Sequence, residues 1–416
     1  MEKAQAVIGA NFGDEGKGLI TDYLAADLGD DGLVVRFNGG AQAGHTVTTP
    51  DGRRHVFSHF GSGSLAGVPS YLSRFFVAHP MLFMKEARVL RRLSAAPLVL
   101  AHPDVAITTP YDVMINQFAE AARGGTRHGS CGLGFGATVE RNFDSRYALS
   151  LRDLFDRDRT VDRLKAIRSA HLPARLGALG VTALTDEQAA LVASDEILER
   201  WLEDAADFLA AVEVTGDAPL RSARRLIFEG AQGLLLDQRG RFFPHLTRSN
   251  TGLRNVLSLA GDLGLERLEV IYVTRAYLTR HGAGPLPGET ARPPVPAVVD
   301  ETNVTNDWQG SLRFAPLDLD LLSETVRADL SESTGAFDLR PSHRLAVTCL
   351  DQAGAEIDFV ERGRSRRAGI GTLITRAAAA AGTSRLLLAS GPTRADVRTC
   401  RAEDVAAERP LVAATA

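Results

Sequence analysis

The stretch Val7-Ile8-Gly9-Ala10-Asn11-Phe12-Gly13-Asp14-Glu15-Gly16-Lys17-Gly18-Leu19 joins a short apolar strand to a helix and decides the fold. Residues 6–9 predict the end of the strand, and apolar residues at helical spacing over 19–26 predict the helix. Glycine lets backbone amides approach a ligand closely, and a helix N-terminus presents unpaired N–H groups and the positive end of a dipole. The loop between them is therefore typical of a phosphate-binding site.

Three charged residues in this loop indicate chemistry beyond phosphate binding. Lys17 offers a positive charge to a phosphate, whereas Asp14 and Glu15 would repel one unless a carboxylate holds Mg²⁺ or moves a proton. The loop is not a Walker A loop, because its glycine spacing differs and the residue after its last glycine, Leu19, has no hydroxyl group. The alternative from these residues alone is a glycine-rich turn with solvated charges.

The composition excludes several classes of protein. A net charge of −4 over 416 residues gives no reason to expect binding to nucleic acid or to anionic membranes. The first residues lack the apolar core of a signal peptide, and no apolar run approaches the roughly 20 residues of a membrane helix. Three scattered cysteines are too few for a disulfide framework or a zinc site. We therefore expect a cytoplasmic protein with no nucleic-acid or membrane partner.

Apolar strands and helical patterns alternate along the rest of the chain. This alternation predicts an α/β fold, with a single large domain over residues 1–416 around a central mostly parallel sheet. The arrangement is similar to that of P-loop NTPases, with helical and loop embellishments. The predicted strands lie at 33–37, 75–78, 105–108, 225–228, 268–274, 345–350 and 385–389, the predicted helices at 81–93, 111–123 and 192–212, and a long loop at 285–310.

Most of these strands are followed by glycine and by one or two polar residues. Ligands of parallel sheets bind at the carboxyl ends of the strands, so we expect one large polar site at that edge. Ordinary turn chemistry between strands and helices is the alternative. It does not explain why the following residues all fall there: Asp14, Lys17, Gln42, His45, Gln232, Arg280 and Arg394.

Several segments form a pattern that is specific when they are taken together. They are Gly13-Asp14-Glu15-Gly16-Lys17-Gly18, Asn38-Gly39-Gly40, Ala43-Gly44-His45-Thr46-Val47, Phe228-Glu229-Gly230-Ala231-Gln232-Gly233, Ser249-Asn250-Thr251, Thr279-Arg280, Gly282-Ala283-Gly284-Pro285 and Ser390-Gly391-Pro392. In this order they resemble the adenylosuccinate synthetase family over nearly the full length of the chain. The resemblance implies a cytosolic homodimer that joins aspartate to IMP at the expense of GTP, with Mg²⁺.

The resemblance also implies roles for the catalytic residues. Asp14 would remove the N1 proton of IMP, so that O6 attacks the γ-phosphate of GTP. His45 would protonate or polarise the departing phosphate oxygen, and Lys17 would neutralise charge that develops on the phosphates. An amine would then displace the 6-phosphate. The Asp14 carboxylate and the carbonyl oxygen of Gly44 would hold Mg²⁺.

The binding residues follow from the same resemblance. GTP would contact Gly13, Glu15, Gly16, Lys17, Gly18, Gly44, His45, Thr46, Asp351, Ser390 and Gly391. IMP would contact Asp14, Lys17, Gln42, His45, Cys131, Gln232 and Thr247, while Arg146 would reach the IMP bound by the partner subunit. Aspartate would contact Thr305 and Arg313.

Three departures from the family pattern bear on specificity. Cys131 stands where the family has a threonine, and a thiol is a poorer hydrogen-bond donor. In Thr348-Cys349-Leu350-Asp351, a cysteine replaces the lysine whose stem covers the guanine base. Residues 304–314 contain only one basic residue, Arg313, where the family has several arginines.

These departures leave alternatives open. We expect GTP to be preferred over ATP, because Asp351 can accept hydrogen bonds from guanine but would face an acceptor at N1 of adenine. Because Cys349 replaces the lysine that covers the base, we also expect some use of ATP. The first alternative is a ligase of the same chemistry that acts on another purine nucleotide, such as dGMP or a secondary-metabolite nucleotide, or that uses ATP or another amine. The second is a nucleotide-binding regulator without turnover, which the intact Asp14, Lys17 and His45 disfavour.

Overall fold

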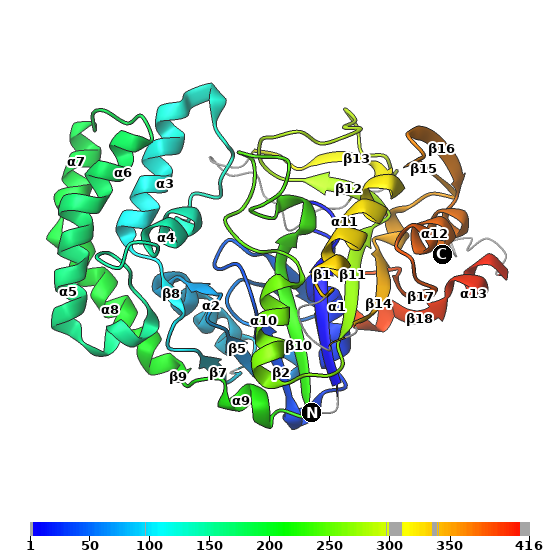
Figure 1. The fold of residues 1–416 in the computed structure, drawn as a ribbon, viewed down its shortest axis with the longest axis horizontal. Helices are drawn as coiled ribbons and strands as arrows, with labels where there is room; N and C mark the ends of the chain where they lie inside the picture. The colour runs from blue at the N-terminus through cyan, green and yellow to red at the C-terminus, as the bar shows by residue number, and fades with distance from the viewer. Residues whose placement is uncertain are drawn as a thin grey trace.

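The computed structural model describes residues 3–95, 97–296, 298, 310–334, 339 and 341–407. A ten-stranded sheet runs through its centre in the order β18-β17-β14-β11-β1-β10-β2-β5-β7-β9 (Figure 1). Neighbouring strands are parallel except β17 and β18. The strands are β1 (Lys3–Gly9), β2 (Gly32–Arg36), β5 (Ser70–Leu72), β7 (Val99–Ala101), β9 (Glu213–Val214), β10 (Arg225–Gly233), β11 (Glu269–Arg275), β14 (Ser342–Thr348), β17 (Arg385–Ala389) and β18 (Val397–Arg401).

Both faces of this sheet are covered, so alternate residues of each strand enter different cores. On β1, Val7 packs in a cluster with Leu19 and Ile20 of α1 (Lys17–Ala25). Ile8 packs on the opposite face, in the cluster that contains α10 (Leu253–Leu263), α11 (Leu319–Ser331) and α12 (Ile370–Ala380). Burial on both faces accounts for the nearly continuous apolar runs in these strands.

The ends of the sheet carry different additions, which Figure 1 separates clearly. A helical region with its own apolar core lies beside β5, β7 and β9. It contains α2 (Pro80–Arg92), α3 (Pro110–Arg123), α4 (Phe135–Arg141), α5 (Arg157–Ala166), α6 (Leu172–Ala178), α7 (Asp186–Ala193) and α8 (Asp195–Ala211), and α9 (Ala218–Ser222) follows. A four-stranded sheet, ordered β12 (Tyr277–Arg280), β13 (Arg313–Asp318), β15 (Glu356–Glu361) and β16 (Arg364–Gly369), extends toward the other end, where α13 (Ala402–Ala407) also lies.

The predicted class and the mostly parallel central sheet are confirmed, whereas some elements differ from the prediction. Residues 75–78 and 105–108 give only β6 (Val77–Ala78) and β8 (Ala106–Ile107), which pair with each other outside the central sheet. The central strands there are instead β5 and β7. Residues 229–233, expected to form a loop, continue β10, and β15, β16 and β18 add strands that the sequence analysis missed.

The long helix predicted at 192–212 is interrupted near its start. Ser194 accepts a hydrogen bond from the backbone N–H of Ile197 and caps α8, so α7 ends one residue earlier at Ala193. Within the described ranges, no helix has the length and apolar character needed to cross a membrane.

Candidate active site

The loop between β1 and α1 has the shape of an anion-binding turn. Gly13 and Gly16 adopt left-handed conformations with φ of 94° and 87°, and Gly16 is the N-cap of α1. Helix α1 then packs against the hairpin of β3 (His45–Thr48) and β4 (Arg54–Phe57). A Cβ at Gly18 would lie 2.8 Å from the carbonyl oxygen of Thr46, so only glycine allows this approach. Consequently the first turn of α1 lies directly beside His45.

Two oppositely charged side chains are buried together in this turn. Glu15 and Lys17 are each 3% exposed, and Lys17 Nζ lies 3.8 Å from Glu15 Oε2. Burial raises the pKa of Glu15 to about 7, and burial lowers the pKa of Lys17 despite the neighbouring carboxylate. Glu15 Oε2 has no hydrogen-bond partner among the described residues. The positive charge of the buried Lys17 is only partly balanced by Glu15, so it is suited to stabilising the negative charge of a bound phosphate.

His45 is held by a carboxylate that the sequence analysis did not assign. Its Nδ1 lies 2.7 Å from Oε1 of Glu229, a fully buried residue of β10. Glu229 also accepts hydrogen bonds from the backbone N–H (3.0 Å) and the hydroxyl group of Ser62, and Arg36 Nη1 lies 3.8 Å away. Burial opposes ionisation of Glu229, yet His45 and Arg36 lower its pKa to about 2.

This arrangement fixes which nitrogen of His45 faces the site. An ionised carboxylate only accepts hydrogen bonds, so Nδ1 carries a proton. The other nitrogen, Nε2, is buried and has no partner in the described chain. Burial lowers the pKa of His45, which favours the neutral ring before a ligand binds. The pair can therefore exchange a proton with a ligand at Nε2, while Glu229 stabilises the imidazolium form.

Asp14 lies beside two residues of the neighbouring strands. It adopts a left-handed conformation with φ of 57°, and its carbonyl oxygen accepts a hydrogen bond from Arg275 Nε. Its Oδ2 lies 3.6 Å from Nε2 of His281, which follows β12. The side chain of Asp14 is 28% exposed, so the carboxylate is open to a ligand. Non-glycine residues in this conformation are uncommon and concentrate at functional sites.

The predicted purine-binding residues meet at the same edge. Both side-chain amide atoms of Gln42 and the Oε1 atom of Gln232 are buried without partners among the described residues. Asn38 joins the loop of Gln42 to the end of β10, since it donates to the carbonyl oxygen of Ala231 at 3.1 Å and accepts from the N–H of Ala231 at 2.7 Å. Because buried polar atoms are normally hydrogen-bonded, these amides have the character of ligand contacts.

The glycine-rich segment 129–136, which follows α3, touches the loop after β12 through the contact of Gly129 with Gly282 and Ala283. Asn116 and Gln117 donate hydrogen bonds to Ser130 Oγ (2.7 Å) and to the Gly132 carbonyl oxygen (3.0 Å), which hold Cys131 between them. Burial raises the pKa of the Cys131 thiol, so it remains protonated near neutral pH. Thr247, also predicted to bind IMP, donates its backbone N–H to the carbonyl oxygen of Leu236.

The residues predicted to bind guanine follow β14 and β17. Thr348 Oγ1 donates to the carbonyl oxygen of Glu15 at 2.8 Å and so ties the end of β14 to the phosphate loop. Asp351 is exposed, and burial of part of its side chain raises its pKa. Ser390 and Gly391 follow β17, where a Cβ at Gly391 would clash with Asp396 at 2.6 Å. Cys349 lies near the guanidinium group of Arg275 on β11, whose charge acts on the thiol against the effect of burial.

Other predicted residues lie farther out or already have partners. Arg146 is 75% exposed and pairs with Asp144 at 2.6 Å. Arg313 donates to Glu289 at 2.7 Å and to the carbonyl oxygens of Gly282 and Gly284. Thr305 lies outside the described residues. The described residues contain no group of three or more His, Cys, Asp or Glu side chains arranged to hold a metal ion.

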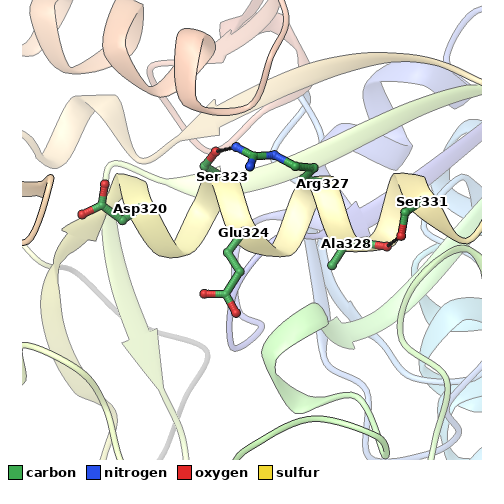
Figure 2. Close-up of a pocket in the computed structure, with 6 residues that line it drawn as sticks. All are labelled: Asp320, Ser323, Glu324, Arg327, Ala328 and Ser331. Atoms are coloured by element: carbon green, nitrogen blue, oxygen red, sulfur yellow. Dashed lines mark hydrogen bonds between the residues drawn. The ribbon is translucent and has the colours of Figure 1, made fainter.

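A shallow depression of about 550 Å³ lies elsewhere, along the outer face of α11 (Figure 2). Its side chains all come from this one helix, and their polar atoms already have protein partners: Arg327 donates to Ser323 at 2.8 Å, Asp320 accepts from the backbone N–H of Gly363, and Glu324 pairs with Arg241. Among the described residues, the lining comes from α11 alone. We therefore assign no chemistry to it.

Sequence reasoning missed three residues of the site, Glu229, Arg275 and His281. Glu229 directly follows the predicted strand 225–228, and because that strand in fact continues to Gly233, the carboxylate is buried and needs a partner. Arg275 and His281 gave no comparable signal, because each follows a strand in an ordinary polar position. Only the sheet order brings them to Asp14.

Comparisons with known protein families identify what the chain is similar to. A family model described as adenylosuccinate synthetase matches residues 6–390. The adenylosuccinate synthetase of Thermoplasma acidophilum is 31% identical over 329 residues, which cover 79% of this chain and 73% of that protein. The one from Bordetella petrii is 33% identical over 299 residues, covering 70% of this chain but only 65% of its own length.

Two solved structures share the fold. A fully ligated adenylosuccinate synthetase from Plasmodium falciparum has a TM-score of 0.69 at 19% identity, and the match covers 95% of this chain and 99% of that one. A succinoaminodeoxyadenylate synthetase of cyanophage S-2L, bound to dGMP and dATP, has a TM-score of 0.61 at 14% identity, with 98% and 99% covered.

Proposed function

The chain belongs to the adenylosuccinate synthetase family of GTP-dependent ligases, which form a C–N bond between aspartate and IMP, and we propose that the sheet edge around Asp14 performs this reaction. The observation that carries the proposal is the buried His45–Glu229 pair beside Lys17, with His45 Nε2 free of protein partners in the described chain. A regulator that only bound a nucleotide would need neither a histidine oriented by a buried carboxylate nor a buried lysine.

The first step activates the purine. The 6-oxo group is a poor leaving group, so Asp14 accepts the N1 proton and the electron pair moves to O6. O6 then attacks the γ-phosphorus of GTP, and the bond to the bridging oxygen breaks to release GDP. Lys17 and the backbone amides of its turn stabilise the phosphoryl charge. Once the phosphates are bound, His45 acts in its imidazolium form, which Glu229 stabilises, and its Nε2–H donates a hydrogen bond or a proton to the phosphate oxygen that departs.

The second step replaces the activated oxygen. The amine of aspartate attacks C6, and the bond from C6 to O6 breaks, so that inorganic phosphate leaves with the purine oxygen. The amine loses a proton as the C–N bond forms, and N1 of the product carries no hydrogen, so this proton and the one held by Asp14 leave with the phosphate or pass to solvent. Thr305 and Arg313 are the residues we propose for the aspartate carboxylates, with Arg313 exchanging its present bond to Glu289 for the substrate.

The family generally depends on Mg²⁺, and the residues at this edge are compatible with that ion. Mg²⁺ prefers hard oxygen ligands and is often held by one or two carboxylates together with substrate phosphates. The partly exposed Asp14 carboxylate and the exposed Gly44 are suited to this, and the lack of a larger acidic cluster in the described ranges agrees with such a sparse site. When bound, the ion would neutralise charge on the transferring phosphoryl group.

We propose the other contacts on the same basis. GTP lies along Gly13, Glu15, Gly16, Gly18 and Thr46, with its base at Asp351, Ser390 and Gly391. IMP lies against Gln42, Cys131, Gln232 and Thr247. We also propose that the protein is cytoplasmic and a homodimer, in which the exposed Arg146 would reach the IMP of the partner subunit.

A second candidate is a ligase of the same chemistry with another purine nucleotide, such as dGMP, or with ATP or another amine. It is favoured by Cys349 and by the existing bonds of Arg313, which weaken the expected recognition of GTP and aspartate.

The deciding experiment measures phosphate release and adduct mass with IMP, GMP or dGMP, with GTP or ATP, and with aspartate or uncharged amines. We expect release to require IMP, GTP and aspartate together. Faster turnover with dGMP or with an uncharged amine would favour the second candidate. If no combination of substrates releases phosphate, the chain is a nucleotide-binding regulator without turnover.

A further inference from the structure

His281 is a histidine that the reaction as described does not use. It comes directly after β12, and its side chain is 16% exposed. Both of its ring nitrogens are nevertheless buried and lack hydrogen-bond partners in the described chain. Imidazole nitrogens in such positions normally have a partner. The ring is therefore in a position to bond to a ligand.

The loop that carries His281 is fixed. The backbone of Gly282 and Ala283 touches Gly129, where a Cβ would lie 2.6 Å from the Ala283 nitrogen. Gly282 and Gly284 adopt φ of 72° and 105°, and both carbonyl oxygens accept from Arg313. The ring position is thus set by backbone contacts on two sides.

Sheet order decides on which side of Asp14 the ring lies. The central order is β11-β1-β10-β2, and Asp14 follows β1. Glu229 belongs to β10 and His45 follows β2, so the phosphate-transfer pair lies on one side of Asp14. His281 follows β12, which continues from β11, so it lies on the other side, with Nε2 3.6 Å from Asp14 Oδ2. That distance is too long for a hydrogen bond, so the two groups face the same space side by side.

The substrate ring has a matching asymmetry. In a 6-oxopurine, N1 is flanked by C6 with its oxygen and by C2. If N1 faces Asp14 and O6 faces the His45 side, then C2 faces His281. We propose that His281 contacts the C2 position of the purine and determines how well a 2-amino group is accepted. This inference rests on the proposed function, and it names the substrate feature that the site discriminates.

The chemistry gives the direction of the effect. One nitrogen of a neutral imidazole accepts a hydrogen bond, and a 2-amino group donates one, whereas the C2–H of IMP does not. Replacing His281 by valine keeps a similar apolar body and removes the acceptor. The affinity for GMP should then fall relative to that for IMP by about tenfold, the loss expected for one hydrogen bond.

The test measures dissociation constants of IMP and GMP by calorimetry on the full chain, with a non-hydrolysable GTP analogue saturating the triphosphate site. We expect the ratio of the IMP constant to the GMP constant to fall about tenfold in His281→Val. The matched control is His343→Val, a part-buried histidine of β14 that bonds to the carbonyl oxygen of Ala381, and it should leave the ratio unchanged.

The outcomes separate the two proposals. An unchanged ratio in His281→Val, with both nucleotides still bound, overturns the role of His281 and leaves the proposed function intact. Failure of the wild type to bind either nucleotide overturns the proposed function. If His281→Val does not fold, a crystal structure of the wild type with GMP decides: a ring nitrogen within about 3.2 Å of the 2-amino nitrogen supports the proposal, and a ring beyond hydrogen-bond range overturns it.

Discussion

Replacing Glu229 with glutamine changes the group that orients His45 while nearly preserving its shape. The carboxylate accepts from His45 Nδ1 at 2.7 Å and from Ser62, and it is the charged neighbour of Arg36. A hydrogen bond to a charged group is worth about 1.5–3 kcal/mol and a neutral one about 0.5–1.5 kcal/mol. Neutralising the acceptor therefore costs about 1–1.5 kcal/mol at His45, or about tenfold in kcat.

Loss of the counter-charge for the imidazolium form adds to this, so we expect kcat to fall roughly 10- to 100-fold. The KM for IMP should change much less, because His45 acts on the phosphoryl group. Arg36 would lose its buried partner, so folding must be checked by circular dichroism and thermal melting. Glu229 is ionised near neutral pH: its folded pKa of about 2 lies below its ordinary value of 4.5. The stability that it contributes is lost only as the pH falls from about 4.5 toward 2, so an assay near neutral pH measures the charged state.

The matched control is Glu269→Gln. Glu269 is a buried carboxylate that accepts from Gln5 (2.8 Å) and Arg344 (2.7 Å), but it lies at the first residue of β11, the edge opposite the site. The Glu269→Gln variant should be less stable than the wild type but should show no comparable loss of kcat. If folded Glu229→Gln retained kcat within threefold of the wild type, or if both variants lost kcat equally, the assignment of His45 and Glu229 to phosphoryl transfer would be wrong.

Three further predictions concern other residues. Asp14→Asn should lower kcat by roughly 10²–10⁴-fold in steady-state assays with the fold intact, and retention of more than about a tenth of the rate would remove Asp14 as the base. Arg313→Ala should raise the KM for aspartate by about one to two orders of magnitude, whereas Glu289→Ala should not, because it only frees the arginine; equal KM values in all three proteins would contradict the role of Arg313. Burial raises the pKa of Asp329 to about 7 from 3.8, so its contribution to stability is fully present below about pH 3.8, falls as the pH rises from there, and is lost once the pH passes 7. Thermal melting at pH values on both sides of 7 should show this loss in the wild type and a smaller one in Asp329→Asn, and identical pH dependence would contradict it.

The parts of the site that the sequence predicted are those encoded by local pattern. The glycine loop before α1 could be predicted because strand, glycines and helix are contiguous, and Lys17 and His45 lie in glycine loops whose chemistry is visible residue by residue. The boundaries of α2 and α3 were also close, since helical periodicity is strong in both, and those of α1 were close because the glycine loop marks its start.

The remainder depends on contacts between distant segments. The pairing of His45 with Glu229 spans 184 residues, and that of Arg275 with Asp14 spans 261. No local pattern reports such contacts, because they follow from the order β11-β1-β10-β2. The short strands β5 and β7 were missed for a related reason: three-residue segments have too little periodicity, and their pairing decides their conformation.

The most direct test of the account follows the oxygen atom at C6. IMP labelled with oxygen-18 at position 6 is incubated with GTP, aspartate, Mg²⁺ and the protein, and the released phosphate is analysed by mass spectrometry or by phosphorus NMR. If O6 attacks the γ-phosphorus before aspartate attacks C6, each adduct formed transfers its label to inorganic phosphate. Adduct formation with unlabelled phosphate would contradict the 6-phosphoryl intermediate, and with it the roles proposed for Asp14 and His45.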